Sequence, residues 1–240
     1  MYSKEINKFL DEKGYSTFDL KAVFFDMDGV LFDSMKYHVI AWIKALQKIG
    51  VTFTEQQAYL NEGRTGASTI DEVFINKFGR NATEDEKQNI YRLKSEFFEE
   101  CGEIEQIPFS HDLLMLVKSQ SMAIFVVTGS GQTSLLESLE KNFPNIFQNE
   151  KMVTAFDVKQ GKPHPEPYLT ALEKSGLKAN QVVVIENAPL GIESAVAAGL
   201  FTIAINTGPL NPQVLTDSGA NIVFDGMKEL YLQWNNFVKN

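Results

Sequence analysis

Two acidic side chains stand one residue apart in the segment KAVFFDMDGVLFDS. Asp26 closes an apolar run, and Asp28 follows just before a glycine. Residues i and i+2 of a strand point to the same face, so a sheet cannot separate these two carboxylates. Carboxylates that are held together repel each other unless they share a proton or bind a cation. The spacing therefore predicts a site where a cation or a shared proton makes that repulsion useful.

Other side chains with useful chemistry also follow apolar runs. Thr128 and Gly129 come at the end of AIFVVT, and Glu186 and Asn187 come at the end of VVVIE. Lys162 lies in the proline-stiffened loop DVKQGKPHPEPY, which follows a further apolar run. Ligands of open α/β sheets bind beyond the carboxyl ends of the strands. We therefore expect these residues and the two aspartates to meet at one edge of a sheet.

The residue types at this edge suit magnesium and a phosphoryl group. Mg²⁺ takes one or two carboxylates and keeps positions for water and phosphate oxygens. The chain has only three histidines and one cysteine, which disfavours a zinc or copper site. A hydroxyl, backbone N–H groups and an ammonium can surround phosphoryl oxygens. We expect Mg²⁺-dependent phosphoryl transfer in which one aspartate attacks, through an aspartyl-phosphate, and the other handles a proton.

The elements that must position these residues are six short apolar runs. Most are apolar on both faces, as in a parallel sheet that helices cover on each side. From residue 123 onward, helical patterns separate the runs, which predicts an α/β fold with a doubly wound, Rossmann-like parallel sheet. The opening segment predicts a short amphipathic helix. The six runs are residues 22–26, 123–128, 151–155, 182–186, 201–205 and 221–224.

The first interval between runs is too long for one crossover helix. A strand–helix–strand unit needs about 30 residues, and this interval holds roughly three times as many. The excess carries only helical patterns, such as SMKYHVIAWIKALQKIG and ATEDEKQNIYRLKSEFFEECG. We therefore predict a small helical cap domain at residues 34–106, inserted into an α/β core made of residues 1–33 and 107–240.

Three residues of the predicted cap have two interpretations each. His38, near the expected hinge, either serves the closed site or packs as a half-buried histidine. Arg64 either contacts a phosphate or leaving group, which guanidinium geometry suits, or is an exposed loop charge. Glu62 would repel a phosphate, so it is either a solvated charge or a residue that meets the metal.

Composition limits the partners and the compartment. The net charge is −9 at pH 7, without a dense basic cluster, which disfavours nucleic acid and anionic membranes as partners. Cys101 is the only cysteine, so no internal disulfide can form and a reducing compartment is expected. No stretch resembles a signal peptide or a bilayer span. We expect a cytoplasmic monomer that acts on a small phosphorylated compound.

Four segments together resemble a known superfamily. DMDGVLFDS, VVTGSG, GKPHPEPY and VIENAPLGIESA resemble, in order and spacing, the four motifs of the haloacid dehalogenase-like (HAD) phosphatases and phosphomutases. The helical insert resembles that family's cap, and the likeness is strongest for the β-phosphoglucomutase-like branch. Within it, ENAPLG and NEGRTGAST are similar to the inorganic pyrophosphatase members.

The resemblance implies roles for the residues at the sheet edge. Asp26 would be nucleophile and metal ligand, and Asp28 would be general acid/base and a metal ligand through its carbonyl. Thr128, in the segment with Gly129, and Lys162 would hold the phosphoryl oxygens. In the fourth motif, Glu186 and Asn187 would lie on the metal side.

One residue departs from the family pattern. The second acidic position of the fourth motif is here the neutral Asn187, so the site is one negative charge short. This shortage and the awkward carboxylate of Glu62 are both explained if cap closure brings Glu62 to the Mg²⁺. The sequence thus predicts a phosphohydrolase of pyrophosphate or a small phosphate ester, with a sugar phosphomutase as the alternative. A phosphate-sensing module is disfavoured because nucleophile and acid/base positions are both intact.

Overall fold

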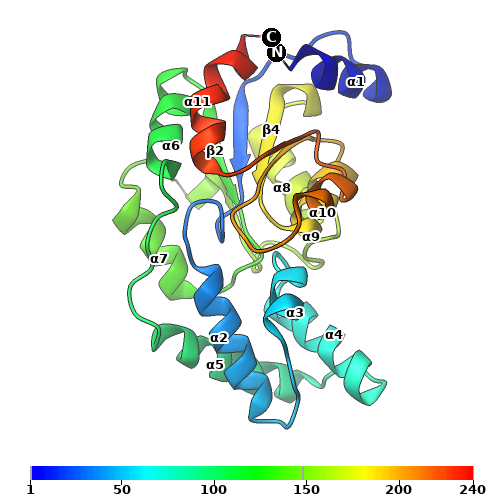
Figure 1. Ribbon diagram of the computed structural model, residues 1–240, viewed down its shortest axis with the longest axis vertical. Helices are drawn as coiled ribbons and strands as arrows, with labels where there is room; N and C mark the ends of the chain where they lie inside the picture. Colours follow the sequence, from blue (N-terminus) through cyan, green and yellow to red (C-terminus); the bar gives the residue numbers. More distant parts are fainter. Residues whose placement is uncertain (1, 148, 240) are drawn as a thin grey trace.

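A six-stranded parallel sheet lies between helices in one half of the molecule, and helices α2 to α5, within residues 35–99, form the other half (Figure 1). The computed structural model describes residues 2–147 and 149–239. The strand order is β3-β2-β1-β4-β5-β6, and every described pair is parallel. All six apolar runs form strands, so the predicted doubly wound α/β fold is confirmed. The strands are β1 (Ala22–Phe25), β2 (Ala123–Val127), β3 (Met152–Val153), β4 (Val182–Glu186), β5 (Phe201–Ile205) and β6 (Ile222–Phe224).

Helices cover both faces of the sheet, which explains why the strands are apolar on both sides. Alternate residues of β1 contribute to different clusters: Val23 and Phe25 to one, Phe24 to the other. The first face is covered by α1 (Ser3–Lys13), α6 (Ser110–Ser119), α7 (Thr133–Asn142) and α11 (Met227–Val238). The second is covered by α8 (Glu166–Ser175), α9 (Pro189–Ala197) and α10 (Pro212–Asp217).

The helix boundaries follow from local sequence. α8 follows Pro165 and ends at Ser175, where Gly176 caps it in the left-handed conformation that glycine adopts readily. Two short 3₁₀ turns, η1 (Asn149–Lys151) and η2 (Ala179–Gln181), precede β3 and β4. Within residues 2–147 and 149–239, none of the helices combines the length and apolarity needed to cross a membrane.

Four helices form within residues 34–106, the part of the first interval for which the sequence predicts helices. They are α2 (Met35–Gln47), α3 (Glu55–Leu60), α4 (Gly66–Phe78) and α5 (Glu84–Glu99). These helices lie beyond the carboxyl ends of the strands (Figure 1) and enclose a hydrophobic cluster of their own, centred on Trp42, Phe74 and Ile90. A separate cluster is what a small inserted domain requires.

The two connections of the insert run side by side. The Asp33 N–H donates to the Glu105 carbonyl at 2.9 Å, and the Ile107 N–H donates to the Leu31 carbonyl at 2.9 Å. Phe32 and Gln106 form an antiparallel bridge between them. We propose this paired crossing as the boundary between the cap, residues 34–106, and the core, residues 1–33 and 107–240.

Candidate active site

The turn that follows β1 fixes the positions of the two aspartates. The N–H groups of Leu31 and Phe32 both donate to the Met27 carbonyl, which closes a tight turn around Asp28. Gly29 has φ +76°, and a Cβ built there would overlap the side-chain amide of Asn187. Only glycine meets both demands, the left-handed backbone and the close approach. The DMDG order therefore places the two aspartates and Asn187 around one turn.

Lys162 joins the first and fourth strand ends. Its ammonium, with 0% exposure, donates to Asp26 Oδ1 at 2.6 Å, to Glu186 Oε1 at 2.6 Å and to the Val127 carbonyl at 3.0 Å. These three bonds use all three ammonium protons. A phosphoryl oxygen would therefore have to share or replace one of them to reach Lys162.

Glu186 is committed to protein donors on both oxygens. Besides Lys162, its Oε1 accepts from the Tyr168 hydroxyl at 2.8 Å. Its Oε2 accepts from the backbone N–H groups of Asn187 at 3.0 Å and Ala188 at 3.3 Å. The carboxylate is fully buried, and in this arrangement it holds Lys162 rather than presenting a free oxygen.

Electrostatics at this cluster favour a bound cation. Burial would lower the pKa of Lys162, but the adjacent Asp26 and Glu186 carboxylates outweigh it and hold that pKa above its usual value, so Lys162 stays protonated. Burial raises the pKa of Asp26 well above its usual range, against the opposing charge of Lys162. A second cation beside Asp26 would favour the ionised form that a nucleophile needs.

Two residues at the start of the cap, Ser34 and His38, hold Asp28. Its Oδ1 accepts a hydrogen bond from the Ser34 hydroxyl and contacts His38 Nε2 at 3.0 Å. Burial would raise the pKa of Asp28, but His38 and Ser34 outweigh it and the pKa lies below its usual value. Burial and the nearby Lys94 charge lower the pKa of His38. A neutral His38 therefore donates its Nε2–H to an ionised Asp28.

His38 fits both of its interpretations from the sequence. It is buried, and its ring centroid lies 4.4 Å from that of Phe98, as expected for a packing residue. The same ring reaches the proposed acid/base residue. The structure thus brings His38 into the site, where it orients Asp28.

The donor set around Asn187 fits an oxygen-seeking cation. Asn187 Nδ2 donates to Glu62 Oε1 at 2.7 Å, whereas Asn187 Oδ1 is buried and has no hydrogen-bond partner among the described residues. Buried oxygens of this kind usually have a partner, and an amide oxygen is an acceptable Mg²⁺ ligand. In the described part of the chain, no three His, Cys, Asp or Glu side chains form a metal cage by themselves. An amide and water would therefore have to complete the coordination.

The loop at residues 62–66 closes the cap onto the core. A Cβ at Gly129 would overlap the Gly63 carbonyl, and one at Gly161 would meet the Thr65 side chain at 2.6 Å. At Gly129 the core backbone therefore packs directly on the backbone of this loop. A cavity of about 60 Å³ remains beneath it, far below the roughly 300–1,000 Å³ of pockets that hold drug-sized ligands.

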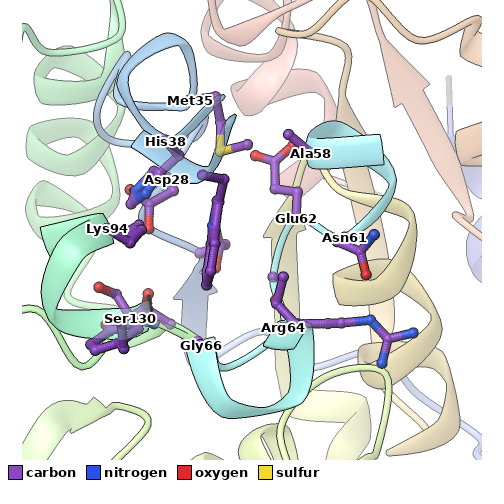
Figure 2. A pocket seen from close by; sticks show the side chains of 17 residues that line it. Asp28, Met35, His38, Ala58, Asn61, Glu62, Arg64, Gly66, Lys94 and Ser130 are labelled. Atoms are coloured by element: carbon purple, nitrogen blue, oxygen red, sulfur yellow. Dashed lines mark hydrogen bonds and ion pairs between the residues drawn. The ribbon is translucent and has the colours of Figure 1, made fainter. Parts of the chain in front are cut away.

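Both domains contribute to the walls of this cavity (Figure 2). Asp28, His38 and Lys94 lie on one side, and Glu62 lies on the other. The cavity is thus the space that the two aspartates share with the cap. Its walls include Asp26, Asp28 and Thr128 from the core and Trp42, Glu62 and Lys94 from the cap.

Thr128 and Arg64 differ in how closely they join the site. Thr128 is 2% exposed, and its Oγ1 accepts from the Ser130 N–H at 3.0 Å, which leaves the hydroxyl proton to donate. Arg64 belongs to the cavity wall, but its guanidinium is directed away from Asp28 and Glu62 (Figure 2). Its Nη1 contacts Ser68 Oγ at 3.3 Å.

Three residues of the site were not singled out from the sequence: Tyr168, Lys94 and Gln132. Tyr168 is fully buried against Glu186, and the apolar pattern of α8 offered no sign of that contact. Lys94 did carry a signal. It lies four residues after Ile90 and four before Phe98, within the buried stripe of α5.

Comparison with known proteins identifies the family of this chain. Residues 23–205 match the family described as haloacid dehalogenase-like hydrolase. The chain belongs to this family. It is therefore an enzyme of the HAD-like class, and the resemblance seen in the four sequence motifs is confirmed.

Relatives of this HAD-like enzyme include phosphatases and phosphomutases. A phosphorylated carbohydrates phosphatase of Thermotoga maritima is 31% identical over 206 residues, covering 84% of this chain and 92% of the relative. A beta-phosphoglucomutase of Bacillus subtilis is 25% identical over 228 residues, covering 89% and 93%. A provisionally named beta-phosphoglucomutase from Bacteroides vulgatus has a solved structure with TM-score 0.96 and 50% identity, covering 99% of this chain and 97% of the other.

Proposed function

We propose that this HAD-like enzyme is a Mg²⁺-dependent phosphohydrolase of a small phosphorylated substrate, with inorganic pyrophosphate as the first candidate. The observation that carries the proposal is the small cavity of about 60 Å³, which has Asp26 and Asp28 in its wall. The phosphatase names among the relatives support hydrolysis. The size of the cavity favours a small leaving group over a hexose.

The proposed reaction uses two displacements at phosphorus. A carboxylate oxygen of Asp26 attacks, an O–P bond forms, and the bond to the leaving oxygen breaks with its electron pair going to that oxygen. Water then attacks the aspartyl-phosphate and gives a proton to Asp28, which releases phosphate and restores Asp26. In the first displacement, Asp28 would have to take up a proton before it could supply one to a basic leaving group, because its pKa lies below its usual value.

The remaining residues of the core bind and neutralise the phosphoryl group. The Thr128 hydroxyl and the Gly129 N–H, which belong to residues of the cavity wall, would donate to its oxygens, and Lys162 would keep Asp26 in position. Asp26, the Asp28 carbonyl and Asn187 Oδ1 would hold Mg²⁺. The bound ion would supply charge neutralisation for the phosphoryl oxygens.

Glu62 supports the placement of a cation at Asn187. Burial raises the pKa of Glu62 well above its usual range, with the Asn187 hydrogen bond opposing. A buried carboxylate facing three others is costly unless a positive charge joins them. Glu62 would therefore complete the metal site from the cap, directly or through a bound water, and would make up for the missing charge at Asn187.

Glu62→Gln is expected to weaken Mg²⁺ binding and pyrophosphate turnover, because it removes the one carboxylate that the cap adds. The metal affinity is measured by titration calorimetry, and turnover by phosphate release at several Mg²⁺ concentrations. Asn187→Asp in the Glu62→Gln background should restore part of the affinity. Glu99→Gln, at an exposed glutamate of α5, is the control. Unchanged Mg²⁺ affinity in Glu62→Gln would remove Glu62 from the metal site.

Asp28→Asn is expected to keep Mg²⁺ binding, since the proposed metal contact of Asp28 is its backbone carbonyl. It should lose proton transfer, a contribution of roughly 10²–10⁴ in rate. The loss is measured as kcat on an alkyl phosphate, which has a basic leaving group, and on 4-nitrophenyl phosphate, which does not. Full kcat on the alkyl phosphate would show that Asp28 is not the acid/base.

A sugar phosphomutase is the second candidate. It is favoured by the 50% identity to the Bacteroides vulgatus protein and by the Bacillus subtilis relative. A mutase would return the phosphoryl group to a second hydroxyl, and a hexose would require the cap to open. A screen against pyrophosphate, sugar phosphates and nucleotides separates the two functions. Phosphate release from pyrophosphate supports the hydrolase, and isomerisation of a hexose phosphate without phosphate release supports the mutase.

We also propose a cytoplasmic monomer without nucleic-acid or membrane partners. The net charge of −9 and the single cysteine support this proposal. Size-exclusion chromatography with light scattering would test the monomeric state.

A further inference from the structure

Lys94 is a buried cation in the cavity wall that no step of the proposed reaction uses. It lies on α5, is 3% exposed, and faces the cavity beside Asp28 and His38 (Figure 2). Lysines are almost never fully buried unless they are paired. Among the described residues, no carboxylate lies within ion-pair distance of its ammonium.

The partners of Lys94 leave hydrogen-bonding capacity for a ligand. Its ammonium donates to Gln132 Oε1 at 3.0 Å, the one hydrogen bond that it makes within the described ranges. Rings surround it at 4.9 Å (Phe98), 5.7 Å (Trp42) and 5.7 Å (Tyr91). An ammonium has three N–H groups, so two have no acceptor in the described part of the protein. Buried donors without an acceptor are costly, which a ligand anion in the cavity would relieve.

The Gln132 contact makes this cation part of a composite site. Gln132 belongs to the core, just before α7, and is 4% exposed. Its N–H donates to Ser130 Oγ at 3.2 Å and its Nε2 donates to Ser134 Oγ at 3.3 Å, which fixes its Oε1 toward the cap. The ammonium is therefore positioned by the core only when the cap is closed.

Two buried lysines, Lys162 and Lys94, lie close to the two aspartates. The ammonium of Lys162 is already used by Asp26, Glu186 and the Val127 carbonyl, so it holds the nucleophile in position. Two cations of the described cavity wall, Arg64 and Lys94, have no carboxylate partner. The guanidinium of Arg64 is directed away from Asp28 and Glu62, whereas Lys94 lies beside Asp28 (Figure 2). Burial lowers the pKa of Lys94 to about 8, with Asp28 opposing, so at neutral pH it remains mostly an ammonium.

We propose that Lys94, held by Gln132, binds the anionic leaving group and selects substrates whose leaving group is a phosphate rather than a neutral sugar hydroxyl. The inference rests on the proposed function and deepens it. When Asp26 attacks pyrophosphate, the bridging P–O bond breaks and its electron pair stays on the departing phosphate. The ammonium stabilises that added charge, and no proton needs to be transferred to the leaving oxygen.

Lys94→Met tests this assignment, because methionine keeps the apolar length and removes the charge. For Lys94→Met we expect kcat/KM on pyrophosphate to fall roughly 10- to 100-fold, the range of one hydrogen bond to a charged group. On 4-nitrophenyl phosphate, whose leaving group carries no phosphate, it should change by less than about threefold. Lys94→Arg should keep part of the preference for pyrophosphate. Lys77→Met, at an exposed lysine of α4, should leave kcat/KM unchanged on both substrates.

Binding of inorganic phosphate provides a readout that does not depend on turnover. In calorimetric titrations with Mg²⁺ present, Lys94→Met should weaken phosphate binding, and Gln132→Leu should weaken it less. Equal losses on both substrates with unchanged phosphate affinity would overturn the assignment and make Lys94 a structural residue. A wild-type enzyme that does not cleave pyrophosphate would overturn the proposed function instead. In that case, weaker phosphate binding in Lys94→Met would still support the anion subsite. Unchanged phosphate binding in Lys94→Met would overturn the subsite as well.

Discussion

Asp26→Asn is expected to abolish phosphate release while the protein keeps its fold. An amide cannot form the acyl-phosphate link that the proposed reaction needs, and loss of a nucleophile typically costs roughly 10⁶ in kcat. The fold should survive because the introduced amide would still offer its oxygen to Lys162, which also keeps Glu186 and the Val127 carbonyl. Steady-state phosphate release with Mg²⁺ and the thermal unfolding midpoint measure the two expectations.

The control for this prediction is Asp33→Asn. Asp33 is a half-exposed carboxylate near the hinge that pairs with Lys36, outside the cavity. The Asp33→Asn variant should therefore release phosphate at the wild-type rate. Acid-quenched wild-type enzyme should carry one phosphoryl group on the peptide that contains Asp26, as seen by mass spectrometry. Turnover of a folded Asp26→Asn protein within tenfold of wild type would eliminate Asp26 as the nucleophile.

Much of the fold could be predicted because each strand is an apolar run bounded by polar residues. The prediction was less accurate at β3, expected over residues 151–155 but paired only at Met152 and Val153. The reason is a local turn: both the N–H and the hydroxyl of Thr154 donate to Asp157 Oδ2 at 2.8 Å, which draws the chain away from the sheet edge. α6 and the six-residue α10 were not named from the sequence.

The site was predictable to the extent that topology alone determines it. Parallel strands end at one edge, so Asp26, Thr128 and Glu186 had to come together once the strands were known. The sequence could not show that all three protons of Lys162 are used, or that Asn187 meets Glu62. Both contacts depend on side-chain rotamers and on how the cap docks, neither of which leaves a periodic signal.

Lys94 was not predicted as a site residue, although its position in the sequence carried a signal. Its spacing from Ile90 and Phe98 placed a lysine in an apolar helical stripe, where a charge is costly unless it has a use. What the sequence lacked was the partner: Gln132 is 38 residues away and belongs to the core. A cation whose partners come from two domains cannot be found by inspecting one helix.

Lys162→Met is expected to cause the largest loss of stability among single substitutions at the site. It removes the cation between two buried carboxylates, Asp26 and Glu186, which are 4% and 0% exposed. Removing one partner of a buried ion pair typically costs about 3–5 kcal/mol because the remaining charge is left without compensation. Urea unfolding at pH 8, with a chelator present so that no metal replaces the lost charge, measures the difference in free energy of unfolding.

The pH dependence of this loss distinguishes charge from packing. Without Lys162, burial and the neighbouring carboxylates raise the pKa of Asp26 in the folded state even further above its unfolded value. A carboxyl group whose folded pKa is raised destabilises the fold above that pKa, and the cost disappears as the pH falls toward the unfolded value, near 4. The deficit of Lys162→Met should therefore shrink between pH 8 and pH 5. Lys174→Met, which removes a partly exposed ion pair with Asp157, should cost at most about 1 kcal/mol at pH 8. A Lys162→Met deficit that stays the same at both pH values would mean that packing of the lysine stem, and not its charge, stabilises this site.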